Sequence, residues 1–169
     1  MNEPQMTVAR REMNMEKIVK DFKGLSNFLA FLGVLQMLNL MPLLETVKQM
    51  DISVLGSVDF AAMGIAASTA LTIVKVMCVV PAVLGIVALL YLCVKGHLEA
   101  RDPSPARFHI ILAVICAVCY AVGALETLVG LFSDSTDLLM KLLEVLIAAG
   151  TAVLLFFYFN YARKICTED

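Results

Sequence analysis

The chain has 169 residues, of which 60% are hydrophobic and 17% charged, and its mean hydropathy is +0.86. Soluble domains carry about 45–50% apolar and about 25% charged residues. This composition excludes a disordered chain, a secreted disulfide scaffold and an ordinary cytosolic enzyme, and it predicts a polytopic membrane protein. The net charge of -2 excludes a strongly basic nucleic-acid binder, so no nucleic-acid partner is expected.

The N-terminal segment, residues 1–24, is predicted to be a cytoplasmic amphipathic helix. Its apolar residues recur at helical spacing, with most of the basic residues between them. These apolar residues are Val8, Met15, Ile18, Val19 and Phe22. Two interpretations are open: the helix lies on the inner leaflet, or it is an extension that packs against the chain's own bundle.

Four apolar segments follow, and each is long enough to cross a bilayer. A helix spans about 30 Å of hydrocarbon with about 20 residues. The predicted spans are about 25–44, 72–94, 108–132 and 142–162. We therefore expect an all-α fold, a polytopic membrane protein that forms one domain over residues 1–169. Its spans would make a four-transmembrane-helix antiparallel bundle in contact with the lipid bilayer, with the amphipathic helix at its N-terminus.

The segment before the second span is unusual. Residues 60–94 contain Lys75 as their only charge, and as one helix they would measure about 52 Å, more than one crossing. Residues 60–74 are rich in alanine and other small residues. This part is predicted to be an interfacial helix on the outer surface, a re-entrant piece, or a helical extension that packs on the bundle.

Lysine and arginine predict the orientation of the chain. Ten basic residues lie in the N-terminal segment, in the loop between spans two and three, and in the C-terminal tail. The alternating segments carry few basic residues and several aspartates. By the positive-inside rule, the chain is a multi-pass protein of the cell membrane with cytoplasmic N- and C-termini.

The loop between spans two and three, residues 95–107, holds two prolines and mixed charges, which predict a solvated turn. Four residues in or beside it have side chains that bind metals in other proteins, but their spacing matches no established metal motif. They are His97, Glu99, Asp102 and His109. We interpret them as solvated loop groups and an interfacial histidine, and we expect no metal or cofactor.

Five polar residues approach the outer edge of the hydrocarbon at a common depth. Three of them are charged and lie 19 or 20 residues from a basic residue at the inner boundary, about 28–30 Å away. The predicted cluster consists of Gln36, Asn39, Lys75, Glu126 and Glu144. It is either an entry site for an ion, proton or substrate, or a set of groups that reach water or pair across helices.

A CxxC motif, Cys116 to Cys119, lies inside span three. In these four residues the chain resembles the quinone-linked thiol oxidoreductases of the vitamin K epoxide reductase family, which also carry a CxxC in a membrane helix. The resemblance implies a redox role for Cys116 and Cys119. The two thiols, however, lie about 13–18 Å beyond Arg107, and the outer loops hold no cysteine pair to relay electrons. Packed membrane thiols are the alternative.

Spans three and four also carry small residues, which allow close packing of membrane helices. They include Ala113, Ala117, Ala121, Gly123, Gly130 and Gly150. Aromatic residues gather near the inner ends of the spans, where an aromatic belt is expected, Tyr158 among them. No catalytic motif is present, so we expect a non-enzyme: an accessory, regulatory or assembly subunit that acts through helix packing. A homo-oligomer or a membrane-protein partner is expected. The alternatives are a small oligomeric transporter or channel and, third, a membrane thiol oxidoreductase.

Overall fold

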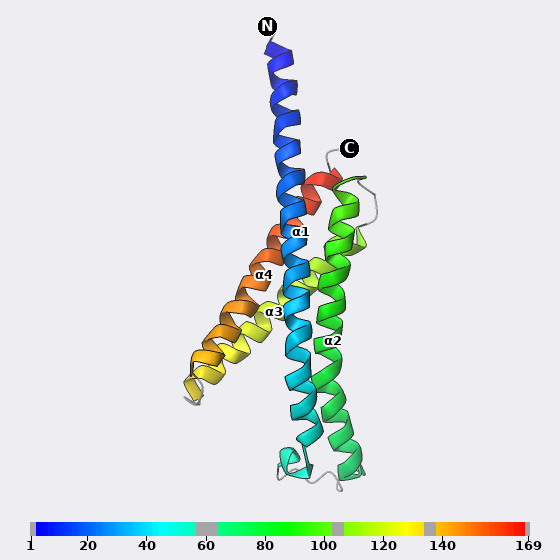
Figure 1. Ribbon diagram of the computed structural model, residues 1–169, viewed down its shortest axis with the longest axis vertical. Coiled ribbons are helices and arrows are strands. Elements are labelled where there is room, and N and C mark those ends of the chain that lie inside the picture. Colours follow the sequence, from blue (N-terminus) through cyan, green and yellow to red (C-terminus); the bar gives the residue numbers. More distant parts are fainter. Residues whose placement is uncertain (1–2, 57–63, 103–106, 134–137, 168–169) are drawn as a thin grey trace. The chain divides into compact units, whose positions relative to one another are not determined.

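The computed structural model describes residues 3–56, 64–102, 107–133 and 138–167, and every regular element in these ranges is helical (Figure 1). The elements are α1 (Glu3–Gln49), a short 3₁₀ helix η1 (Ile52–Leu55), α2 (Ala67–Glu99), α3 (Phe108–Ser133) and α4 (Leu138–Thr167). Four helices are long and apolar enough to cross a membrane. The prediction of an all-helical chain with four candidate spans is thereby confirmed.

The chain divides into two compact units. The first unit combines residues 1–32 with residues 88–169, and the second contains residues 33–87. The first unit therefore includes the N-terminal part of α1, the C-terminal part of α2, and all of α3 and α4. The second unit includes the remainder of α1 and α2 with η1 between them.

In the first unit, the N-terminal segment continues into the first span without a break, because residues 3–49 form one helix. Part of the apolar stripe predicted for this segment packs against other helices of the same unit. Phe22 is fully buried, and Ile18 and Val19 pack against the core. These contacts support the interpretation of a helical extension that packs against its own chain, and Phe22 is part of the core itself.

The core of the first unit draws residues from all four helices. Its largest apolar members come from α1 (Phe22, Leu29), α2 (Leu89, Leu92) and α4 (Leu155, Tyr158), with Ile110, Ala113 and Cys116 from α3. Helices α3 and α4 run side by side in opposite directions (Figure 1). The short connection between them favours this arrangement, since neighbouring helices joined by few residues pack antiparallel.

Helix α2 extends further at both ends than the predicted span of 72–94. It begins at Ala67, so residues 67–74 continue directly into the span, which agrees with the helical extension among the three alternatives. Residues 60–63 lie outside the described ranges. At the other end α2 continues to Glu99, and backbone hydrogen bonds from Ala100 and Asp102 close it. The predicted solvated turn therefore starts later than Lys95.

In the second unit, η1 is held by a local cap. Asp51 accepts hydrogen bonds from the Ser53 backbone N–H, at 2.9 Å, and from the Ser53 hydroxyl. The Ser53 hydroxyl, followed by the Ser53 amide, holds the pKa of the Asp51 carboxyl below its ordinary value of 3.8, and the charge of Lys75 adds a smaller effect. Gly56 ends the turn with φ of 61°, a conformation that glycine adopts without strain.

Candidate functional site

Tyr158 on α4 is the largest fully buried side chain in the described part of the protein. Its hydroxyl donates a hydrogen bond of 3.0 Å to the backbone carbonyl of Leu92 on α2. Its ring lies 4.9 Å, between centroids, from the ring of Phe22 on α1. One residue thus joins three helices, and we name the surrounding packing the Tyr158 junction: Phe22, Ser26, Leu92, Gly96, His109 and Tyr158.

Gly96 on α2 permits the closest helix approach at this junction. A Cβ atom at Gly96 would overlap the Ser26 hydroxyl of α1 and would lie 3.0 Å from the Tyr158 ring. Ser26 is itself fully buried and donates a hydrogen bond of 2.8 Å to the Phe22 carbonyl. Because that hydroxyl needs a partner when buried, its position beside Gly96 is fixed by its own helix.

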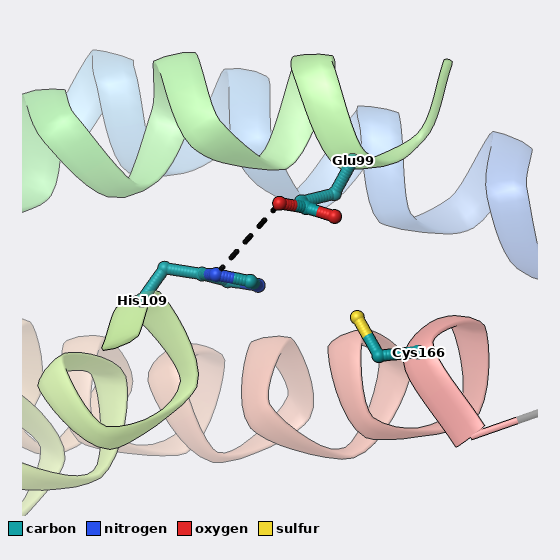
Figure 2. Close-up of side chains that lie close together, drawn as sticks. All are labelled: Glu99, His109 and Cys166. Atoms are coloured by element: carbon teal, nitrogen blue, oxygen red, sulfur yellow. Dashed lines mark ion pairs between the residues drawn. The ribbon is translucent and has the colours of Figure 1, made fainter. Parts of the chain in front are cut away.

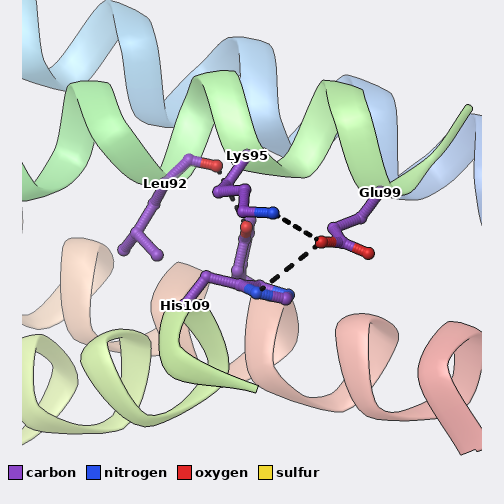
Figure 3. Close-up of polar contacts among 5 residues, drawn as sticks. Leu92, Lys95, Glu99 and His109 are labelled. Carbon is purple, nitrogen blue, oxygen red and sulfur yellow. Dashed lines mark hydrogen bonds and ion pairs between the residues drawn. The ribbon is translucent and has the colours of Figure 1, made fainter. Parts of the chain in front are cut away.

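Glu99 and His109 are buried polar residues beside the junction, with side chains that are 1% and 0% exposed. The Lys95 ammonium lies 2.9 Å from Oε1 of Glu99, and Nδ1 of His109 lies 4.0 Å from the same oxygen (Figure 3). The interpretation of Glu99 as a solvated loop charge is therefore wrong, whereas the interfacial depth of His109 stays a prediction. Both residues lie inside helices that pack together, whereas Asp102 is exposed as predicted.

Cys166, near the end of α4, completes a group of three metal-binding side chains. One ligand atom from each of Glu99, His109 and Cys166 lies within 4.8 Å of the other two. Figure 2 shows the Cys166 sulfur directed toward the space between the carboxylate and the imidazole. The three residues come from α2, α3 and α4. We name them the Glu99–His109–Cys166 triad.

Sequence reasoning missed the central residues of this region. Tyr158 was placed in an aromatic belt, but it is fully buried, whereas its neighbour Phe157 is 48% exposed. Cys166 was not linked to Glu99 and His109. A usable signal was present in the sequence: Glu99 lies four residues before Pro103, and His109 lies four residues after Pro105. Such positions on consecutive helices meet when the helices pack antiparallel.

The predicted outer polar cluster is divided between the two units. Gln36, Asn39 and Lys75 belong to residues 33–87, while Glu126 on α3 and Glu144 on α4 belong to the other unit. Both glutamates are exposed, and Lys75 is half-buried and close enough to Asp51 to lower its pKa. Three of the five residues thus belong to one unit and two to the other, and the cluster as a whole stays a prediction.

The CxxC motif places its two thiols in different surroundings. Cys116 is buried in the core of the first unit, whereas Cys119 is exposed. Residues three apart on a helix are neighbours on its surface, yet these two straddle the edge of the packed face. All five cysteines are free thiols. A redox role for Cys116 and Cys119 stays a prediction.

The fold and site define an all-helical protein with four candidate membrane spans and a buried polar group where helices meet. Searches with protein-family models, against curated proteins and against solved structures found no match to this chain.

Proposed function

We propose that the chain is a multi-pass protein of the cell membrane that acts without catalysis of its own, as an accessory, regulatory or assembly subunit. It works through helix packing with a second copy or with a membrane-protein partner. Its spans form an antiparallel bundle, preceded by the amphipathic helical segment. The observation that carries this proposal is a contrast among glycines in the first unit.

Gly96 is packed against Ser26 and Tyr158, but other glycines of the first unit face open space. A Cβ atom at Gly123, Gly130 or Gly150 would meet no atom within 4 Å. In membranes, small residues are enriched where helices approach closely, because they let two backbones come together. The open glycines on α3 and α4 therefore suit a helix from outside the first unit, and we propose that a second copy or a partner supplies it.

The exposure of α3 and α4 supports the same proposal. In their most apolar windows, within Phe108–Gly130 and Lys141–Cys166, only 22% and 17% of residues are buried inside the chain. Apolar side chains such as Val129, Leu139 and Leu146 are more than half exposed. In water such surfaces would aggregate, whereas in a bilayer they contact lipid or neighbouring helices.

The helix-packing proposal is tested by co-purification of the full chain in mild detergent, with chemical crosslinking and mass spectrometry. We expect a stoichiometric partner or a second copy. Gly150→Leu should leave the fold intact, because its surroundings are open, and should weaken association about three- to tenfold. Phe156→Trp, an enlargement at an exposed position about 120° around the same helix from Gly150, is the matched control. A monodisperse single chain without crosslinks would contradict the proposal.

The orientation is tested separately by cysteine accessibility in intact cells. Asp51 and Asp102 are both exposed and both lie in connections between spans. In the proposed topology, an impermeant thiol reagent added outside labels Asp51→Cys but not Asp102→Cys, and the unsubstituted chain sets the background. The reverse pattern would place the termini outside.

A second candidate function is a small oligomeric transporter or channel. The exposure of Glu126 and Glu144 favours it, because charged side chains in membrane helices usually face a bundle interior or a water-filled cavity. An oligomer would supply such surroundings. Proteoliposome flux that falls with Glu126→Gln, while the variant remains folded, would support this candidate over the first.

A further inference from the structure

We propose that Glu99, His109 and Cys166 bind a divalent transition-metal cation of the zinc type. The first observation is convergence. The three side chains come from α2, α3 and α4, and one ligand atom of each lies within 4.8 Å of the others (Figure 2). Tetrahedral zinc, with bonds of about 2.0–2.3 Å, holds its ligand atoms about 3.3–3.8 Å apart. Side-chain movements of about 1 Å would therefore close the site around an ion.

The second observation is the type and burial of the donors. A thiolate, an imidazole and a carboxylate form a ligand set suited to zinc, while calcium and magnesium prefer oxygen alone. Glu99 and His109 are almost completely buried, and Cys166 packs against the core. Three protein ligands leave a fourth position for water or for a donor from another molecule.

Lys95 is the cation that already contacts this triad. Its ammonium lies 2.9 Å from Oε1 of Glu99, and its side chain is 25% exposed (Figure 3). It can keep this contact while the second carboxylate oxygen binds the metal, as outer-shell partners of metal ligands do. It can also turn toward solvent, since its side chain is partly accessible.

Metal binding here requires one proton to leave and no electron to move. The Cys166 thiol releases its proton to water as the sulfur–metal bond forms, and His109 binds as the neutral imidazole. The charges of the carboxylate and the thiolate then balance the two charges of the cation. The bound triad itself is neutral, and the remaining positive charge is that of Lys95, whose side chain is 25% exposed and reaches solvent.

The experiment uses the full chain in detergent, with Zn²⁺ and Co²⁺ alone as probes. We expect about one metal ion per chain and a thiolate-to-cobalt charge-transfer band in the ultraviolet. Cys166→Ser should abolish that band and weaken Zn²⁺ binding more than about 100-fold, beyond the loss typical of an outer-shell partner. His109→Gln should weaken Zn²⁺ binding to a similar extent. Cys93→Ser and His97→Gln change the same residue types nearby, outside the triad, and should leave binding unchanged.

A second measurement needs no substitution and is independent of whether a variant folds. Zn²⁺ should slow alkylation of Cys166 at least tenfold, and a chelator should restore the rate. The exposed Cys119 is the internal control, and its rate should not change. Absence of Zn²⁺ binding, binding that survives Cys166→Ser, or equal alkylation rates with and without Zn²⁺ would each overturn the proposal. None of these outcomes bears on helix association.

Discussion

The ten largest fully buried side chains belong to residues 1–32 and 88–169, whereas residues 33–87 bury single, mostly aliphatic residues. In the described part of this second unit, the buried hydrophobic residues are Val47, Leu55, Ala70 and Ile86, each between 5% and 9% exposed. In the first unit, aromatic, aliphatic, hydroxyl, imidazole and carboxylate groups are buried together. The described parts of the two units therefore differ in the kinds of side chain that they bury.

The difference shows what specifies packing among apolar helices. Apolar surface gains little by leaving lipid for protein, so a helix pair needs close backbone approach or polar contacts to become specific. The Tyr158 junction has both: Gly96 lets α1 approach α2, and the Tyr158 hydroxyl reaches the Leu92 carbonyl. The junction therefore supplies both kinds of contact where α1, α2 and α4 meet.

The largest expected effect on stability is that of Tyr158→Ala, which removes the central side chain of the Tyr158 junction. Truncation of a fully buried aromatic side chain typically costs about 3–5 kcal/mol, because both contacts and a filled volume are lost. We expect a decrease of this size in the free energy of unfolding in detergent. Phe157→Ala, at the exposed neighbouring position, should change it by about 0.5 kcal/mol or less. Equal effects at both positions would show that the junction has no special weight.

The next prediction concerns a larger residue at Gly96, where α1 and α2 approach closely. Gly96→Ala forces a methyl group against Ser26 and Tyr158, and overpacking of this kind costs about 1–3 kcal/mol. Ser26→Ala in the same chain should recover part of that loss, since it removes the overlapping hydroxyl and neighbouring substitutions are non-additive. Gly150→Ala is the control: it has open surroundings in a helix and should be neutral or stabilising by up to about 1 kcal/mol.

A smaller effect isolates the hydrogen bond from the packing. Tyr158→Phe keeps the ring beside Phe22 and removes only the hydroxyl that donates to Leu92. Polar contacts between membrane helices average about 0.6 kcal/mol and reach about 1.7 kcal/mol. We expect a loss within this range in detergent unfolding. A loss as large as that of Tyr158→Ala would mean that the hydroxyl, and not the ring, organises the junction.

Much of the fold could be predicted from the sequence, because a charge-free apolar run of about 20 residues is typical of a helix that crosses a membrane. The four helices and the continuation of residues 67–74 into a span agree with that reasoning. The extent of α2 did not follow, because Lys95 was taken as a boundary. A lysine with a long apolar stem is tolerated within a helix when Glu99, one turn later, pairs with its ammonium.

The candidate site was harder to predict, because its members are distant in the chain. Cys166 lies 57 residues after His109, and no spacing rule connects them. Only the packing of α2, α3 and α4 brings the triad together. The burial of Tyr158 was hard to predict for a different reason. Tyr158 lies among consecutive aromatic residues, and the sequence does not show which of them faces the core.

The smallest expected effect concerns the second unit, where Asp51 caps the short helix η1. The pKa of Asp51 is lowered in the folded chain, chiefly by the Ser53 hydroxyl. At pH values above 3.8, the ordinary pKa of the group, the ionised carboxylate therefore stabilises η1. That contribution is lost as the pH falls through the lower pKa of the folded chain.

An NMR titration of Asp51 should have its midpoint below pH 3.8, with the Ser53 amide signal following the same curve. Ser53→Ala should move the midpoint up toward 3.8, because it removes the largest cause of the shift while the Ser53 backbone N–H still donates. A midpoint that Ser53→Ala leaves unchanged would show that the hydroxyl does not hold this turn.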